Sequence, residues 1–386
     1  MIKNRYIIGV GAFLSLGLMG LFLALVGTSL PQMRIYFNIS IRQAGLITSV
    51  VQMGYALTCF LGGSISDLFK KNYVIMLGTF ILGLGTLIFG ITSNYELNLI
   101  LFAILGFGAG LILSASNALV ADLFTEKRGT ALNIHHVFFA VGSFIGPLLV
   151  KYFIKHNKWI FTFRFYGIIM CLISIFFIFT SPPIVVNNKN DGYIKNLLVL
   201  LKNKHFVLLV VLNFFFLGIQ FTEMFLLVTY LNSYKGFTIS QAALVMSLFY
   251  ILLAGGRVLI STVALRVDVS EILSVLTVMV SISLLSGWIT KGILCAISFA
   301  LSGLFFSGIF PSILALVTGI ISIEVSGTAL GLMAMMGGIG GMILSYLVAS
   351  ISQVSGMGIG FLMLFILFSL ATIVYVLGFK KYYLIR

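Results

Sequence analysis

The sequence predicts an all-α integral membrane protein with twelve transmembrane helices in two six-helix halves. Three observations predict this class. Of the 386 residues, 60% are hydrophobic and only 8% are charged, whereas a soluble globular chain carries about 25% charged residues. The apolar residues form long runs of the length that a spanning helix requires. One long polar stretch at the middle of the chain separates these runs into two groups.

The individual spans follow from the length of the apolar runs, because a spanning helix needs about 20 mostly apolar residues. The segments that qualify are 6–31, 41–65, 73–92, 96–121, 130–154, 160–180, 206–231, 240–263, 271–289, 292–319, 326–350 and 358–379. Most connections between them are short. The exception is 181–205, which opens with Pro182-Pro183 and contains NNKNDGY. We therefore expect an N-terminal half at residues 1–180, a cytoplasmic linker at 181–205 and a C-terminal half at 206–386.

The orientation is predicted from Lys and Arg, which are enriched in cytoplasmic loops. With the N-terminus inside, fourteen basic residues fall on the cytoplasmic side and eight on the outer side. We therefore expect a multi-pass protein of the cell membrane with cytoplasmic N- and C-termini. The net charge of +14 is dispersed over the ends of apolar runs, and no basic face is left to bind nucleic acid.

Enzyme and metal chemistry find no support in the sequence. Cys59, Cys171 and Cys295 all lie inside apolar runs, a spacing that fits neither a disulfide framework nor a metal cluster. There is no P-loop, HExxH or GxSxG motif. We expect a protein that is not an enzyme, uses no cofactor, works as a monomer in the lipid bilayer and has a small-molecule substrate.

The two halves share sequence landmarks. Gly129-Thr130-Ala131-Leu132 opens the fifth span, and Gly327-Thr328-Ala329-Leu330 opens the eleventh. Thirteen residues after the first glycine of each comes another, Gly142 and Gly340. Internal repeats of this kind are typical of transporter folds, in which the substrate binds near mid-membrane between the repeats.

The loop after the second span carries a recognisable motif. Residues 62–72 read GGSISDLFKKN, and Gly63, Asp67 and Lys71 fit the pattern G-x-L-x-D-x-x-G-R of the major facilitator superfamily. The resemblance implies the fold of that superfamily and a gating role for these three residues. The pattern is broken at Leu68, Lys70 and Asn72; the alternative interpretation is an ordinary basic loop between spans.

Further charged residues lie at the inner ends of spans. Asp122 and Arg128 flank the turn between the fourth and fifth spans, and Arg257 follows Gly255-Gly256 in the eighth. We expect these residues to contribute to an inner gate, with Arg257 either reaching the cytoplasm or pairing with an acid such as Asp268. The alternative is a solvated cluster of little energetic value.

A narrower resemblance covers nearly the whole chain. The fifth span reads RGTALNIHHVFFAVGSFIGPLL from Arg128, the fourth carries Asn117, and the seventh carries Gly218-x-Gln220. The tenth reads GLFFSGIFPSILAL and the eleventh contains MAMMGGIGG. These segments are similar to the fucose–galactose–glucose:proton symporter group, which implies proton-linked transport of a small solute.

The departures from that group concern its sugar site. The acids of the first and fourth helices fall here at Gly27 and Leu113, and a substrate-binding Asn of the fifth falls at Phe139. Sugar binding needs several well-placed donors and acceptors, because an unpaired buried polar group is costly. The resemblance therefore favours the fold and transport, and disfavours a hexose as substrate.

The seventh span carries the first candidate group for coupling and substrate binding. Asn213, Gln220 and Glu223 share one helical face. Glu223 is an acid in the middle part of a span, and such a residue is a functional candidate by default. Because burial favours the protonated form of a carboxyl group, Glu223 could load and release a proton. The alternative is a structural Glu that is neutral or paired with Arg.

The fourth and fifth spans carry the second group. Asn133 and His136 lie on one face of the fifth span, and Asn117 lies in the fourth. A histidine can relay protons at physiological pH, or it can hydrogen-bond a neighbouring helix. We include Phe139 with these candidates because it occupies the position of the substrate-binding Asn of the symporter group.

The sequence thus predicts a secondary active transporter that moves a small organic solute by alternating access, as a proton-linked symporter. One alternative is a drug or metabolite exporter of the same superfamily, since Gly142-x-x-x-Gly146-Pro147 matches part of an exporter signature. The other is a non-transporting membrane sensor with this fold.

Overall fold

The structure, a computed structural model, describes residues 4–180, 193–322 and 325–380, with the side chains of 60–68, 128, 193–195, 326, 327, 379 and 380 excepted. These residues are almost entirely helical. The long helices are α1 (Arg5–Phe37), α2 (Ile41–Leu68), α3 (Lys71–Ile88), α4 (Tyr95–Leu123), α5 (Arg128–Lys155), α6 (Trp159–Ile178), α8 (Lys204–Ser233), α9 (Ile239–Val263), α10 (Val269–Ile289), α13 (Ser326–Ser355) and α14 (Met357–Val374). The shorter ones are η1 (Thr125–Lys127), α7 (Tyr193–Lys202), α11 (Gly292–Phe306), α12 (Ile309–Ile320) and η3 (Tyr375–Lys380).

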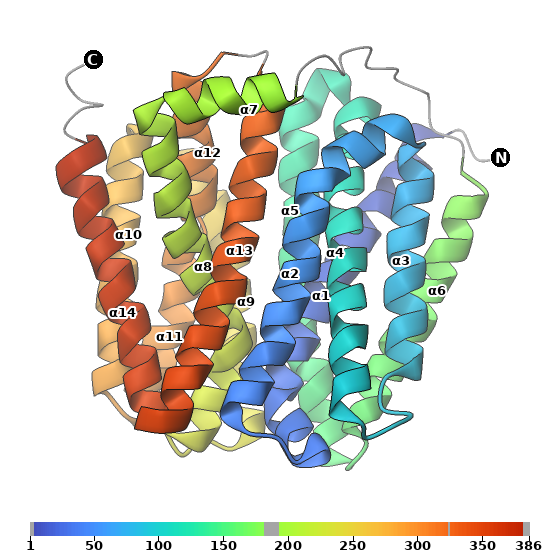
Figure 1. Cartoon of the computed structure of the whole chain (residues 1–386), viewed down its shortest axis with the longest axis vertical. Helices are drawn as coiled ribbons and strands as arrows, with labels where there is room; N and C mark the ends of the chain where they lie inside the picture. Colours follow the sequence, from blue (N-terminus) through green and yellow to red (C-terminus); the bar gives the residue numbers. More distant parts are fainter. Residues whose placement is uncertain (1–3, 181–192, 323–324, 381–386) are drawn as a thin grey trace.

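Within the described residues, eleven segments are long and apolar enough to span a membrane, counting α11 and α12 together. The helix α2 supplies the twelfth span, so the expected twelve-helix architecture in two six-helix halves is confirmed. Figure 1 shows α1–α6 on one side and α8–α14 on the other. The short helix α7 lies across the end of the bundle at which α1 begins and α14 ends (Figure 1). The part of the predicted linker before α7 lies outside the described residues.

The tenth predicted span is divided into two helices. The segment 292–319 was expected to be continuous, and the structure interrupts it at Ser307 and Gly308, between α11 and α12. Pro311 explains the interruption, because it has no N–H to donate to the carbonyl of Ser307 and is tolerated only in the first turn of a helix. The two short helices together still give a segment long enough to span.

The glycines that echo each other in the sequence mark close helix contacts. A Cβ atom on Gly142 of α5 would lie 1.7 Å from the carbonyl oxygen of Gly17 in α1. A Cβ atom on Gly340 of α13 would lie 2.2 Å from the carbonyl oxygen of Phe214 in α8. Small residues let helix backbones approach in membranes, where van der Waals contact drives helix association. The two halves therefore use equivalent glycines to pack their first and fifth helices together.

The halves meet along α2 and α13, and most closely where α2 begins and α13 ends (Figure 1). There the backbone N–H of Ile41 donates to Gln353 Oε1 at 3.1 Å, and Arg42 Nε donates to the hydroxyl of Tyr346 at 2.8 Å. The helices α1 and α8 also touch across the interface, as do α5 and α9. These contacts close the bundle at the end opposite to α7.

The packing at Gly142 gives a first prediction. Gly142→Ala should lower the thermal stability of the purified protein, because the added methyl group would meet backbone atoms of α1 that cannot move independently. Overpacking of this kind typically costs about 1–3 kcal/mol. Thermal unfolding in detergent measures the effect.

The matched control is Gly331→Ala in α13, where an added Cβ atom meets nothing within 4 Å. Alanine favours the helix there, so the melting temperature should stay the same or rise. If both variants melted at the same temperature as the native protein, the close contact of α1 and α5 at Gly142 would be contradicted.

Candidate functional site

Glu223 lies in the middle of α8 and is fully buried, with 0% of its surface exposed. Its Oε1 atom is 2.7 Å from the hydroxyl oxygen of Ser302 in α11. Its Oε2 atom is buried and has no hydrogen-bond partner among the described residues. The single intramembrane acid expected to carry chemistry therefore sits in an apolar interior with one oxygen paired and one unpaired.

The other two candidates on α8 differ from each other in their surroundings. Asn213 is fully buried, and its Nδ2 atom donates to the carbonyl of Met333 in α13 at 2.8 Å. It lies ten residues before Glu223, or about 15 Å along the helix, so the two side chains are well separated. Gln220 lies one turn from Glu223 and is 6% exposed. Of the three residues predicted to share one face of this helix, Gln220 and Glu223 lie one turn apart. Asn213 lies farther away and connects α8 to α13.

The candidates on α5 face a residue of the other half. Arg257 of α9 donates from Nη1 to the backbone carbonyl of His136 at 3.3 Å, and its guanidinium carbon lies 6.0 Å from the ring centroid of Phe139. Asn133, one turn earlier, is exposed. Asp268, the acid named as a possible partner of Arg257, instead caps α10 by accepting from the backbone N–H of Ser270. Arg257 therefore connects the two halves through a backbone carbonyl.

His135 and Asn117 lie within the N-terminal half. The Nε2 atom of His135 is 3.0 Å from the hydroxyl of Ser116 in α4, and the ring is fully buried. Asn117 follows Ser116 and is half-buried, and its Oδ1 atom has no hydrogen-bond partner in the described chain. The contact of His135 with Ser116 joins α5 to α4, a structural use of an imidazole. No cluster of His, Cys, Asp or Glu suited to a metal ion is found among the described residues.

Two of the predicted gating residues form an ion pair. Lys71, at the start of α3, pairs with Asp122, near the end of α4, and both side chains are partly exposed. The pair joins two helices of the same half. The side chains of Asp67 and Arg128, and the surroundings of Gly63 in α2, lie outside what the structure describes.

Sequence reasoning missed several buried polar groups near the interface. Gln52 of α2 is 0% exposed and lies against Gly341 of α13, and neither of its amide atoms has a hydrogen-bond partner in the described part of the chain. The hydroxyls of Thr28 and Ser29 in α1 are equally buried and unpaired there. The available signal was a glutamine inside an apolar run. Such a residue usually makes an ordinary hydrogen bond between helices, so it did not stand out as a candidate.

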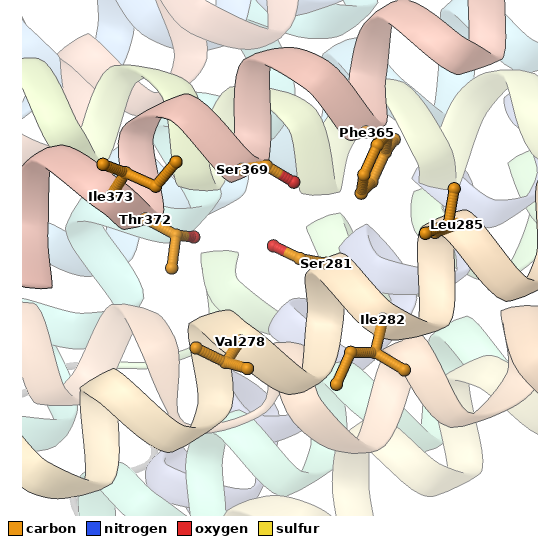
Figure 2. Close-up of a pocket in the computed structure, with 8 residues that line it drawn as sticks. All are labelled: Val278, Ser281, Ile282, Leu285, Phe365, Ser369, Thr372 and Ile373. Carbon is orange, nitrogen blue, oxygen red and sulfur yellow. The ribbon is translucent and has the colours of Figure 1, made fainter.

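A pocket of about 220 Å³ lies elsewhere, between α10 and α14 (Figure 2). Its lining consists of Val278, Ser281, Ile282, Leu285, Phe365, Ser369, Thr372 and Ile373. All of these residues belong to the C-terminal half, and none is a candidate site residue. The pocket is therefore separate from the interface at which Gln52 and Arg257 lie.

This arrangement defines a class of protein. Two groups of membrane-spanning helices meet along α1, α2, α5, α8, α9 and α13, and polar side chains are buried at and near their contact. The family model described as "Major Facilitator Superfamily" matches residues 12–343. The chain belongs to the major facilitator superfamily.

Individual relatives agree with this assignment. The chain is 26% identical to the "Protein TsgA homolog" of Buchnera aphidicola subsp. Baizongia pistaciae over 50% of this chain and 51% of that protein, so it spans about half the length of that relative. It is 24% identical to the glucose/mannose transporter GlcP of Bacillus subtilis over 90% of this chain and 88% of GlcP. The crystal structure of a variant of the E. coli fucose:proton symporter FucP superposes with a TM-score of 0.70 at 20% identity, covering 98% of this chain and 99% of that one. This likeness supports the fold.

The Lys71–Asp122 pair gives a second prediction. Lys71→Met and Asp122→Asn should each lower stability, and the double variant should lose less than the sum of the two. We expect a coupling of about 0.2–1 kcal/mol, which is the range for partly exposed pairs, and a weaker coupling at high salt. Thermal unfolding of the four proteins at two salt concentrations measures it.

The matched control replaces the exposed Lys291. Lys291→Met combined with Asp122→Asn should give strictly additive losses. Additivity in the Lys71 cycle as well would mean that the ion pair does not stabilise the α3–α4 contact.

Proposed function

We propose that this protein is a proton-linked secondary transporter of a small organic solute that works by alternating access. Residues 1–180 and 206–386 form the two moving halves, 181–205 is the cytoplasmic linker, and both termini face the cytoplasm of the cell that holds the protein in its membrane. The inner gate consists of Gly63, Asp67, Lys71, Asp122, Arg128 and Arg257. Membership of the superfamily and the interface between the halves support this function.

The observation that carries the proposal is the environment of Glu223. The hydroxyl oxygen of Ser302 lies 2.7 Å from Glu223 Oε1 and 2.6 Å from the carbonyl of Phe299. A hydroxyl carries one proton. When Glu223 is ionised, Ser302 donates to it; when Glu223 is protonated, Glu223 donates to Ser302, which then donates to Phe299. The site accommodates both protonation states without moving a helix.

The energetics of solvation also favour a change of protonation at Glu223. A charged carboxylate in an apolar interior is strongly disfavoured, so the full burial of Glu223 favours a proton on it. When the halves separate and water reaches α8, ionisation becomes cheaper. A cycle of opening and closing therefore couples to proton uptake and release.

The relatives suggest the kind of solute. GlcP is described as a glucose/mannose transporter and FucP as a fucose:proton symporter. These descriptions support proton-linked transport by a protein similar to the fucose–galactose–glucose:proton symporter group. At the expected acid position of the first helix, however, a Cβ atom on Gly27 would lie 2.5 Å from the carbonyl oxygen of Met224 in α8. A side chain at this position would press on the backbone of α8 in this arrangement, which disfavours a sugar site built like that of the group.

Glu223→Gln tests the proposal. The amide keeps the shape and hydrogen bonding of the acid and cannot ionise. In proteoliposomes, the variant should lose accumulation driven by a pH gradient and should keep solute exchange at equal pH on both sides. The loss follows from fixing the group in its neutral form.

The control is Glu271→Gln, an exposed acid in the first turn of α10, which should accumulate solute like the native protein. Accumulation that still follows the pH gradient in Glu223→Gln would refute the assignment, and a loss of coupling in His136→Gln would then move the role to α5. A native protein that binds solute and shows no exchange would be a sensor.

A further inference from the structure

Arg257 is a charged group inside a span. It lies six residues before the end of α9, or about 9 Å along the helix. Arginine keeps its charge at every accessible pH, and a charge within the hydrocarbon region is costly unless it is compensated. What faces Arg257 therefore indicates what the site is built to hold.

The protein itself compensates this charge only partly. Of the five N–H donors of a guanidinium, one is used, by Nη1 toward the carbonyl of His136 at the long distance of 3.3 Å. Nε is buried and has no partner, and Nη2 donates to no described residue. No ion pair of Arg257 is found within the described chain. The face of Phe139 at 6.0 Å adds a weak attraction.

The unused donors have a specific geometry. Nε and Nη2 lie on the same edge of the guanidinium, and this edge matches the two oxygens of a carboxylate in a bidentate pair. The contact with His136 uses the other side of the group. The residues of α5 that contact Arg257, His136 and Phe139, bring no acid to the site, and Glu223 is hydrogen-bonded to Ser302.

We propose that Arg257 binds the carboxylate group of the transported solute, which makes small organic anions the substrate class. This inference rests on the proposed transport function. The carboxylate pairs with the Nε–Nη2 edge of Arg257, at the contact between α5 and α9 where the two halves meet. The anion supplies the missing counter-charge. Because protein atoms cover Nε here, the Arg257 side chain must turn this edge toward the carboxylate when the solute binds.

The test compares carboxylates with neutral amides of the same shape. Purified full-length protein is titrated by calorimetry with succinate, lactate and benzoate, and in parallel with succinamide, lactamide and benzamide. We expect saturable binding of at least one carboxylate and none of its amide. In Arg257→Gln the dissociation constant for that carboxylate should rise about 10-fold or more, since charge-assisted hydrogen bonds are lost.

Two further variants make the result specific. Arg266→Gln, a matched change at an exposed arginine, should bind the carboxylate like the native protein. Arg257→Lys keeps the charge and loses the bidentate edge, so it should bind with intermediate affinity. Thermal unfolding without ligand shows whether Arg257→Gln is folded. If it is not, Arg257→Lys serves as the test variant. Equal binding of acid and amide, unchanged affinity in Arg257→Gln, or no binding of any carboxylate would overturn the proposal.

Transport assays separate this inference from the function on which it rests. If counterflow in proteoliposomes proceeds with a neutral solute and survives Arg257→Gln, the protein is a transporter and the anion site is refuted. If a carboxylate binds through Arg257 and no exchange is observed, the anion site stands and the transport function fails.

Discussion

The structure depends on the absence of water in the bilayer core, where every buried polar group must find its partner within the protein. Helices satisfy the backbone, and glycines such as Gly142 and Gly340 let them pack without side chains between them. Many buried polar side chains follow the same rule, as when the hydroxyl of Thr58 donates to the carbonyl of Gly54 or that of Ser174 donates to a carbonyl of α3. Groups that break the rule are the most informative part of the molecule.

Glu223 and Arg257 are among the groups of this kind that carry a charge or can acquire one. Glu223 keeps one oxygen unpaired inside α8, and Arg257 keeps its Nε unpaired at the contact with α5. An unpaired buried group costs about 1–3 kcal/mol, and more if it is charged. The proposed function gives a reason to retain this cost: in the proposed cycle a proton neutralises Glu223, and an anionic solute supplies the counter-charge of Arg257. Gln52, buried and unpaired beside Gly341, has the same character without a charge.

Much of the fold could be predicted because membrane thickness fixes the length of each apolar run. Glu223 could be singled out as a candidate as well, since an acid within a span is rare. Its partner Ser302 could not, because a serine in an apolar helix is ordinary. Arg257 was expected to reach the cytoplasm or pair with Asp268, and the structure gives it the carbonyl of His136, since backbone carbonyls leave no trace in a sequence. The break between α11 and α12 was not predicted, because a proline either kinks a helix or starts a new one, depending on its place in the helix.

The central claim is that Glu223 carries a proton while it is buried, as it is here, and loses it when water reaches α8. Infrared difference spectroscopy of the purified protein at neutral pH tests this most directly, because a protonated carboxyl group absorbs apart from an ionised one. The account predicts a protonated-carboxyl band that is present in the native protein and absent from Glu223→Gln. A native spectrum without a band that depends on Glu223 would contradict it.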